Sequence, residues 1–193
     1  MSRTAVGHCI LCFFIGLMLM ACEHTGGKTW DSERGILVDL DADFAMQFPD
    51  WGGWNLMDST GSADVMFCAV NSTTGAAVML CNLSDEGVSP ELTETRALQH
   101  IDVLSRQGDN MQMIYADPVI APAEYMGDNA YKFRRDILFP INGSVDTARI
   151  AYTGYIFDRA GTEYGFVITI PADIIDTYGD SALSEVFDGL RLD

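Results

Sequence analysis

The sequence is poor in basic residues. Of its 193 residues only 11 are lysine or arginine, against 28 aspartate or glutamate, which gives a formal net charge of −17. A protein this acidic is repelled by nucleic acid and by anionic lipid head groups. We therefore expect no nucleic-acid partner, and protein partners whose surface is neutral or basic. The alternative is that the charge serves only to keep the protein soluble.

Histidine is scarce as well. The chain has three histidines, of which His24 and His100 follow the first 21 residues. A Ser-His-Asp or Cys-His site would need one of these two, and neither stands in a recognised nucleophile motif. Together with the cysteines they also lack the paired spacings of a zinc site. The sequence thus predicts no catalytic residue, no metal site and no cofactor, and we expect the protein not to be an enzyme.

No apolar run is long enough to span a bilayer. The run from Cys9 to Ala21 is roughly two thirds of the ~20 residues that a transmembrane helix needs. Arg3 precedes it, and a short apolar run behind a basic residue is typical of a signal peptide.

The apolar run ends in Leu19-Met20-Ala21-Cys22, which resembles the lipobox of bacterial lipoproteins. The resemblance implies a signal peptide over residues 1–21, cleavage before Cys22, and lipid on the Cys22 thiol and on the new amino group. Two or three acyl chains anchor a protein firmly to a membrane. Glu23 replaces the aspartate that signals inner-membrane retention in many Gram-negative bacteria, so we expect the outer membrane, with the protein facing the periplasm. An ordinary signal peptide or an uncleaved anchor is the alternative.

Cysteine usage agrees with export. Cys9 and Cys12 leave with the leader and Cys22 takes the lipid, so Cys68 and Cys81 remain in an oxidising compartment. They form a candidate disulfide.

The pairing of Cys68 with Cys81 depends on one hairpin loop. Residues 63–71 and 76–83 read as two strands. A loop centred on Thr74-Gly75, or one built on residues 73–76, places the two cysteines opposite each other. A loop over residues 72–75 instead places Cys68 opposite Met79, and the two thiols then act as small buried hydrophobes.

The folded domain is predicted to follow a polar tether over residues 22–35, and to extend as one unit over residues 36–193. From Ile36 to Phe48 apolar residues alternate with polar ones, which indicates a half-buried strand, broken by a turn near Asp41 to Asp43. Asp39, Asp41 and Asp43 have the spacing that opens a calcium loop. Phe44 stands where that loop needs glycine, so we interpret the three aspartates as a solvated strand face.

The rest of the chain predicts two helices and a meander. One helix starts at Ser89-Pro90-Glu91 and stops at Gly108, and its apolar face comprises Ala97, Leu98, Ile101 and Leu104. A two-residue turn at Asn142-Gly143 would place Phe133 opposite Tyr152 and Asp136 opposite Arg149, and a three-residue loop at 159–161 would place Ile156 opposite Phe166. The closing helix, with a bend near Gly179, buries Ile175, Tyr178, Ala182, Leu183, Val186 and Leu190.

These elements define an α+β fold in which helices flank an antiparallel β-sheet. The order of elements, with Phe48-Pro49, Trp54 and the C-terminal helix ending in the segment 187–192, resembles the PsbP/DcrB-type α/β/α sandwich. Proteins with this fold are extrinsic photosystem subunits and bacterial envelope lipoproteins, and most of them have no catalytic activity. The resemblance therefore implies a non-catalytic role, and the family has no shared catalytic residues to assign to this sequence. Trp51 and Trp54 are either a stacking platform for a ligand or, as in that family, partly buried.

The function predicted from the sequence is a non-enzymatic accessory or adaptor lipoprotein of the bacterial cell envelope. Two alternatives remain open: a carrier of a small hydrophobic or cationic ligand, and a hydrolase with an unrecognised acidic site.

Overall fold

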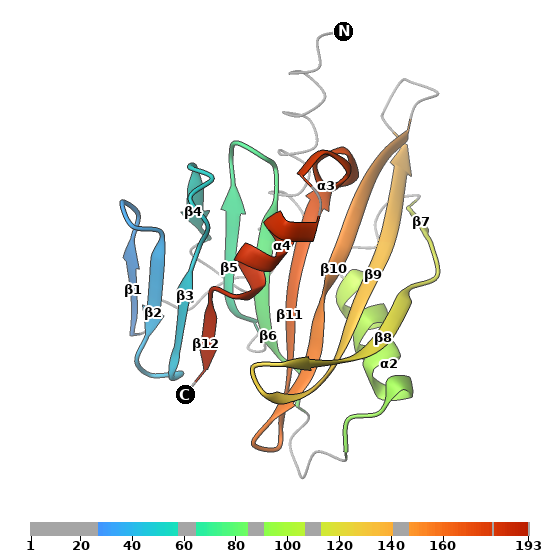
Figure 1. Cartoon of the computed structure of the whole chain (residues 1–193), viewed down its shortest axis with the longest axis horizontal. Helices are drawn as coiled ribbons and strands as arrows, with labels where there is room; N and C mark the ends of the chain where they lie inside the picture. The colour runs from blue at the N-terminus through green and yellow to red at the C-terminus, as the bar shows by residue number, and fades with distance from the viewer. Residues whose placement is uncertain are drawn as a thin grey trace, which may run out of the picture.

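The computed structural model describes residues 27–57, 65–84, 91–106, 113–140, 147–178 and 180–192. These residues form twelve strands and three helices, shown in Figure 1. The elements are β1 (Lys28–Asp31), β2 (Ile36–Asp39), β3 (Phe44–Gln47), β4 (Trp54–Leu56), β5 (Val65–Asn71), β6 (Ala77–Asn82), α2 (Glu94–Ser105), β7 (Ile114–Tyr115), β8 (Val119–Tyr125), β9 (Asp128–Pro140), β10 (Thr147–Arg159), β11 (Thr162–Pro171), α3 (Ala172–Tyr178), α4 (Asp180–Phe187) and β12 (Leu190–Leu192).

The strands form two antiparallel sheets. The larger sheet has the order β4-β5-β6-β11-β10-β9-β7, and β8 also pairs with β9. The smaller sheet has the order β1-β2-β3-β12. Antiparallel strands with a few helices confirm the α+β class expected from the sequence.

The smaller sheet begins earlier than the sequence suggests. Lys28 pairs with Asp39 and Asp31 pairs with Ile36, so β1 belongs to the folded domain. The predicted tether over residues 22–35 is therefore wrong at its C-terminal end, because the polar residues after Lys28 pair with β2. The predicted turn near Asp41 to Asp43 is confirmed, since it separates β2 from β3.

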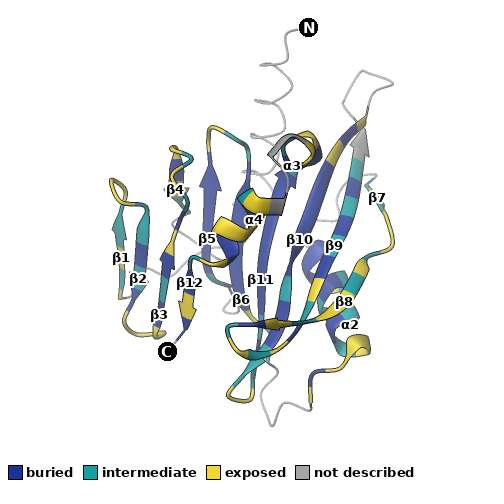
Figure 2. Ribbon diagram, in the orientation of Figure 1, coloured by how far each residue is buried: buried dark blue, intermediate teal, exposed yellow. Residues whose placement is uncertain are grey.

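Apolar side chains fill both faces of the larger sheet. On one face, which we call the α2 side, Ala97, Ile101 and Leu104 of the helix pack on residues such as Phe133 and Val167. On the opposite face, the α4 side, the smaller sheet and the closing helices pack on the sheet. Figure 2 accordingly shows the central strands β5, β6, β11 and β10 as largely buried. Burial on both faces explains why these strands read as continuous apolar runs.

The meander has a different register from the predicted one. Ile150 pairs with Ile137 and Phe133 pairs with Gly154, so the register is shifted by two residues from the one that a two-residue turn at Asn142-Gly143 would give. The shift of two residues keeps every side chain on its predicted face. As a result Asp136 and Arg149 still form an ion pair, with 3.4 Å between Oδ2 and Nη1, although they are not directly opposite.

The connection between β10 and β11 is shorter than predicted. Arg159 pairs with Thr162 across the two-residue turn Ala160-Gly161, whose φ angles are 53° and 84°. Two positive φ values are typical of a type I′ hairpin turn. Phe166 therefore faces Tyr155, and the predicted pairing with Ile156 is wrong. The prediction assumed one apolar face, whereas both faces of this sheet are buried and permit either register.

The helices also differ from the prediction at their ends. Thr93 caps α2, and its side chain accepts a hydrogen bond from the Arg96 N–H. The predicted start at Ser89-Pro90 lies outside the described residues. So do Gly108, Gly179 and the Asn142-Gly143 turn. The closing helix ends at Phe187, and Leu190 belongs to β12 instead, where it pairs with Met46. Leu190 thus leaves the helix because β3 supplies the backbone partners that a strand needs.

Candidate functional site

The lipidation candidate Cys22 and the tether histidine His24 lie outside the described residues. In the part of the chain that the structure describes, no helix combines the length and hydrophobicity that crossing a membrane would require.

Cys68 of β5 and Cys81 of β6 are buried, and their side chains lie on the α2 side of the larger sheet. Cys68 pairs directly with Met79, so the loop covers residues 72–75 and the two arrangements with opposed cysteines are wrong. Diagonal neighbours have Cα atoms roughly 7–8 Å apart, whereas a disulfide usually needs about 4.4–6.8 Å. The register therefore favours two thiols, and the disulfide stays a prediction for thiol counting.

The Asp39, Asp41 and Asp43 series forms a turn. Asp39 is buried, and its carboxylate accepts hydrogen bonds from the backbone N–H groups of Asp41 and Ala42 at 3.0 and 3.1 Å. The predicted solvent exposure is thus wrong for Asp39, because a short carboxylate that caps a turn must point back at the backbone. No group of three potential metal ligands is found among the described residues.

The two tryptophans of the 51–54 segment stack on each other. Their ring centroids are 5.6 Å apart, and the Nε1 of buried Trp54 donates a hydrogen bond to the Pro49 carbonyl at 3.0 Å. Trp54 also packs on Phe48, with centroids 4.9 Å apart. The burial of at least one tryptophan is confirmed, and the segment closes the edge of the core.

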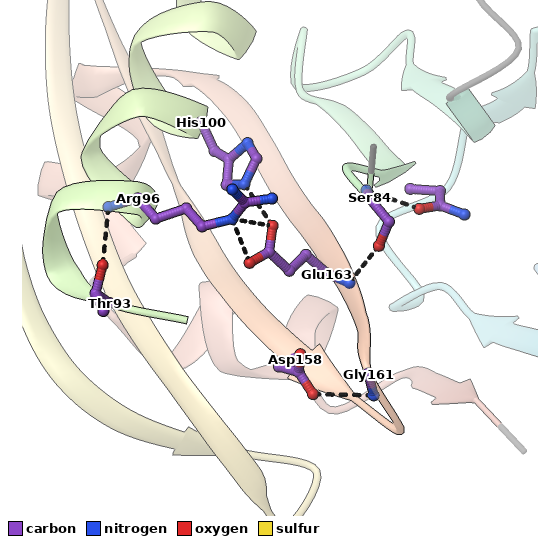
Figure 3. A network of polar contacts seen from close by, with 8 residues as sticks. Ser84, Thr93, Arg96, His100, Asp158, Gly161 and Glu163 are labelled. Carbon is purple, nitrogen blue, oxygen red and sulfur yellow. Dashed lines mark hydrogen bonds and ion pairs between the residues drawn. The ribbon is translucent and has the colours of Figure 1, made fainter. Parts of the chain in front are cut away.

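The polar cluster that sequence reasoning missed surrounds Glu163, shown in Figure 3. Glu163 is completely buried at the start of β11. Its carboxylate accepts hydrogen bonds from the Arg96 Nε, which lies 2.6 Å from Oε1 and 2.7 Å from Oε2. The His100 Nε2 lies 2.8 Å from Oε2. We call these three residues the Glu163 cluster.

Local structure places each member of the cluster. Arg96 and His100 are four residues apart on α2, so they share one side of the helix. Val167 of β11 lies on the α2 side. Glu163 is four residues before it, and alternate residues of a strand share a face, so the Glu163 side chain lies on the α2 side as well. Contacts of its backbone fix its position. The Glu163 N–H donates to the Ser84 Oγ at 2.8 Å (Figure 3), and the Leu83 N–H donates to the Glu163 carbonyl, also at 2.8 Å.

Opposing effects act on the Glu163 carboxyl group. Burial raises its pKa, but the hydrogen bonds from Arg96 and His100, together with the charge of the Arg96 guanidinium, outweigh burial and hold the pKa below its usual range. The carboxylate is therefore ionised at neutral pH and has both oxygens occupied. Both of its oxygens are bound by side chains of α2, so the cluster forms an ionic clamp between α2 and β11.

A second ionic cluster holds the other end of α2. Buried Arg135 of β9 donates from Nη1 to Asp102 Oδ1 at 2.9 Å and to Ser105 Oγ at 2.7 Å, and from Nε to the Ala116 carbonyl at 3.0 Å. Its guanidinium carbon also lies 6.0 Å from the centre of the Tyr115 ring. The hydrogen bond from Arg135 lowers the pKa of Asp102. These contacts explain why Arg135 stands among the apolar residues that β9 presents on the α2 side.

Tyr152 lies directly opposite Arg135 in the sheet. Its hydroxyl is buried and has no hydrogen-bond partner among the described residues. Burial raises the pKa of Tyr152 well above its usual value, so the hydroxyl stays protonated. A neutral phenol without a base beside it is not an activated nucleophile.

Two open hollows of similar size mark the surface. One of about 520 Å³ is lined by β3, by Glu185 of α4 and by the segment 188–191, and one of about 530 Å³ lies where Asp43, Asp128 and Arg159 meet at the hairpin ends. In the second hollow Arg159 is already paired with Asp128 at 2.9 Å. The Glu163 cluster lines neither hollow.

Comparison with known proteins gives a fold and no more. At the level of sequence, no protein-family model and no curated protein matches the chain. The solution structure of cyanobacterial PsbP (CyanoP) from Synechocystis sp. PCC 6803 is similar, with a TM-score of 0.51 and 15% identity over 91% of this chain and 99% of that one. The domain is therefore PsbP-like in fold.

Two further structures are similar at lower scores. LpqN, involved in cell envelope biogenesis of Mycobacterium tuberculosis, has a TM-score of 0.44 and 15% identity over 77% of this chain and 82% of its own. The Ran-binding protein Mog1p of Saccharomyces cerevisiae has a TM-score of 0.47 and 10% identity over 81% and 94%. A shared fold does not establish a shared function.

Proposed function

We propose that the protein is a non-enzymatic accessory lipoprotein of the bacterial cell envelope, anchored through lipid on Cys22 and acting through contacts with other proteins. In this proposal the domain is a helix-flanked, PsbP-like sandwich on the periplasmic face of the outer membrane. The net charge of −17 favours partners whose surface is neutral or basic.

The observation that supports this function best is the state of the Glu163 carboxylate. It is the fully buried acid of the described domain, and an acid of that kind is the usual candidate for acid–base catalysis. Here Arg96 and His100 occupy both of its oxygens. Its role is then to stiffen a scaffold that presents surfaces.

Lipidation is tested with a labelled fatty acid in cells that express the full chain. The wild type and Cys68→Ser are expected to take up label and to fractionate with membranes, whereas Cys22→Ser takes up none and is released or mislocalised. Equal labelling of Cys22→Ser and the wild type would refute the anchor.

The absence of catalysis is tested on purified mature protein with ester, peptide, phosphate and glycoside substrates. We expect no turnover. Turnover that disappears in a folded Glu163→Gln variant would replace the accessory role with an enzymatic one. Affinity capture from detergent-solubilised envelopes, read by mass spectrometry, is expected to return partner proteins that Cys22→Ser recovers less well.

A further inference from the structure

The larger sheet is covered on both faces over most of its width, but the outer part of its β7–β8–β9 end, beyond the buried Tyr125 and Ala130, is covered on one face only. There α2 covers the side that carries Phe133 and Ile137. On the opposite side the outer residues of these strands are exposed or half-exposed, and Figure 2 shows much of β8 as exposed. We call this surface the β7–β9 face; it consists of Ile114, Val119, Ala121, Lys132, Arg134 and Leu138.

The strand register brings these six residues together. They form three directly opposed cross-strand pairs: Ile114 with Leu138, Val119 with Arg134, and Ala121 with Lys132. Side chains opposed in this way have Cβ atoms about 4.5–5.5 Å apart, so the two members of each pair are neighbours. Along β9 the pairs at Lys132 and Arg134 are adjacent on this face, and Asp136 lies between Arg134 and Leu138.

The face is unusually apolar for exposed surface. Val119 is 74% exposed and Ile114 is 64% exposed, and the other large exposed hydrophobics of the described chain, Leu40 and Val103, belong to a turn and to α2. An exposed apolar patch rimmed by charge marks an interaction site in soluble domains.

The charge of the face is opposite to that of the domain. Lys132 and Arg134 project from it. Asp136 lies on the same face and is shared between Arg134 at 3.2 Å and Arg149 at 3.4 Å, and Arg149 also pairs with Asp176 at 2.7 Å, so three cationic side chains meet two acids. Since the chain has 28 acidic and 11 basic residues, a locally positive patch is an exception to its composition.

We propose that the β7–β9 face docks a segment of a partner protein that carries aliphatic and acidic side chains. Aliphatic groups would bury Val119 and Ile114, and carboxylates would pair with Lys132 and Arg134. This inference deepens the proposed function and rests on it, since it presumes that the protein acts through protein contacts. The partner is neutral or basic as a whole, because long-range repulsion by the acidic domain disfavours an acidic one.

Two features favour this occupant over a second copy of the chain. A second copy has a net charge of −17 of its own, so the two domains repel each other. The edge strand β8 also contains Pro122, which has no N–H group to offer a second edge strand.

The position of the face favours a protein over the membrane. Cys22 precedes Lys28 of β1 by six residues, which reach about 20 Å when extended. β1 lies at one end of the long axis of the molecule and β7 at the other, and β8 starts near β7 and runs back toward the middle (Figure 1). An anchor near β1 thus leaves the β7–β9 face free to meet a protein.

The test uses the full mature chain, made soluble by Cys22→Ser, and three fluorescein-labelled 12-residue peptides. Their sequences alternate valine with glutamate, with lysine or with serine. In fluorescence anisotropy we expect the valine–glutamate peptide to bind about tenfold more tightly than the other two, a difference of ~1.4 kcal/mol.

Matched variants locate the binding. Val119→Ser and the double variant Lys132→Glu/Arg134→Glu should each weaken binding of the valine–glutamate peptide roughly fivefold or more. Val103→Ser, at a valine that is 63% exposed on α2, and Arg34→Glu, at an exposed arginine, should leave it unchanged. Circular dichroism checks that each variant is folded, and exposed positions of this kind tolerate substitution.

Several results would overturn the inference. Equal binding of the three peptides would do so, as would equal losses of peptide affinity in Val103→Ser and Val119→Ser. A dimer in analytical ultracentrifugation that Val119→Ser dissociates would assign the face to a second copy of the chain. Sedimentation with phosphatidylglycerol vesicles that Val119→Ser abolishes would assign it to the membrane. The inference also fails if no peptide binds while envelope capture still returns partners, and then the proposed function stands. If Cys22 carries no lipid, the proposed function fails, and the peptide series still decides the docking face.

Discussion

Arg96 on α2 donates hydrogen bonds to both carboxylate oxygens of Glu163 on β11, 67 residues later in the chain, with Nε 2.6 Å from one oxygen and 2.7 Å from the other. His100 completes the contact from the next turn of the same helix. The fully buried acid of the domain is thereby converted into a joint between its helix and its sheet.

Removing the charge of Glu163 should destabilise the domain. In Glu163→Gln the Arg96 guanidinium and the His100 ring lose a buried carboxylate, and we expect the free energy of unfolding to fall by about 2–4 kcal/mol. Urea unfolding followed by circular dichroism measures it. The control is Glu185→Gln, at an exposed glutamate of α4, which should change stability by less than about 0.5 kcal/mol. Equal effects of the two substitutions would mean that the cluster contributes little.

The same carboxylate makes stability depend on pH. Because the pKa of Glu163 is lower in the folded protein than in the unfolded chain, its contribution is complete above the usual glutamate pKa of about 4.3 and is lost as pH falls through the folded value. We therefore expect the wild type to lose more stability than Glu163→Gln between about pH 5 and pH 3. Urea titrations at each pH give the difference, and parallel curves would contradict the assignment.

Arg135 should be as important as Glu163 for the opposite end of α2. Arg135→Met keeps an apolar stem but removes the hydrogen bonds to Asp102, Ser105 and the Ala116 carbonyl, and we expect a loss of about 2–3 kcal/mol. The Ala116 amide, which bonds the Asp136 carbonyl at 3.0 Å, should exchange its hydrogen faster. Arg34→Met, at a side chain that is 77% exposed, is the control. Unchanged exchange at Ala116 would show that β7 is held by other contacts.

Thiol counting decides the state of Cys68 and Cys81. The disulfide predicted from the sequence would leave no reactive thiol, whereas the register, with Cys68 opposite Met79, favours two per chain when the unreduced Cys22→Ser protein, made without residues 1–21, is unfolded in denaturant. Protein reduced before unfolding supplies the reference value. A count of zero would mean that the hairpin rearranges to form the disulfide, and it would then add about 3 kcal/mol in the chain-entropy model.

Local patterns in the sequence determined many of the elements. Alternation from Ile36 to Phe48 predicted β2 and β3 with the turn between them, because side chains of a half-buried strand alternate between two environments. Periodicity likewise predicted that Ala97, Ile101 and Leu104 of α2 are buried. These signals depend only on neighbours in the chain.

Register was harder to predict because it depends on loop length and on what covers each face. The two-residue turn at Ala160-Gly161 shifts β11 by one position relative to the predicted loop, and this shift moves Glu163 to the α2 side. With the correct turn, the pairing of Glu163 with Arg96 and His100 would have been a reasonable hypothesis from the sequence. The error followed from assuming one buried face, whereas this strand is buried on both.

Only the tertiary structure decided the rest. Nothing local to Leu190 distinguishes the last residue of a helix from the first of a strand, and the backbone of β3 made it a strand. The exposed β7–β9 face arises in the same way, because the helix that covers Phe133 leaves Val119 uncovered on the other side of the sheet. Composition and periodicity determine which residues can be buried, but ion pairs and uncovered faces depend on which distant elements meet, and that is a property of the folded chain.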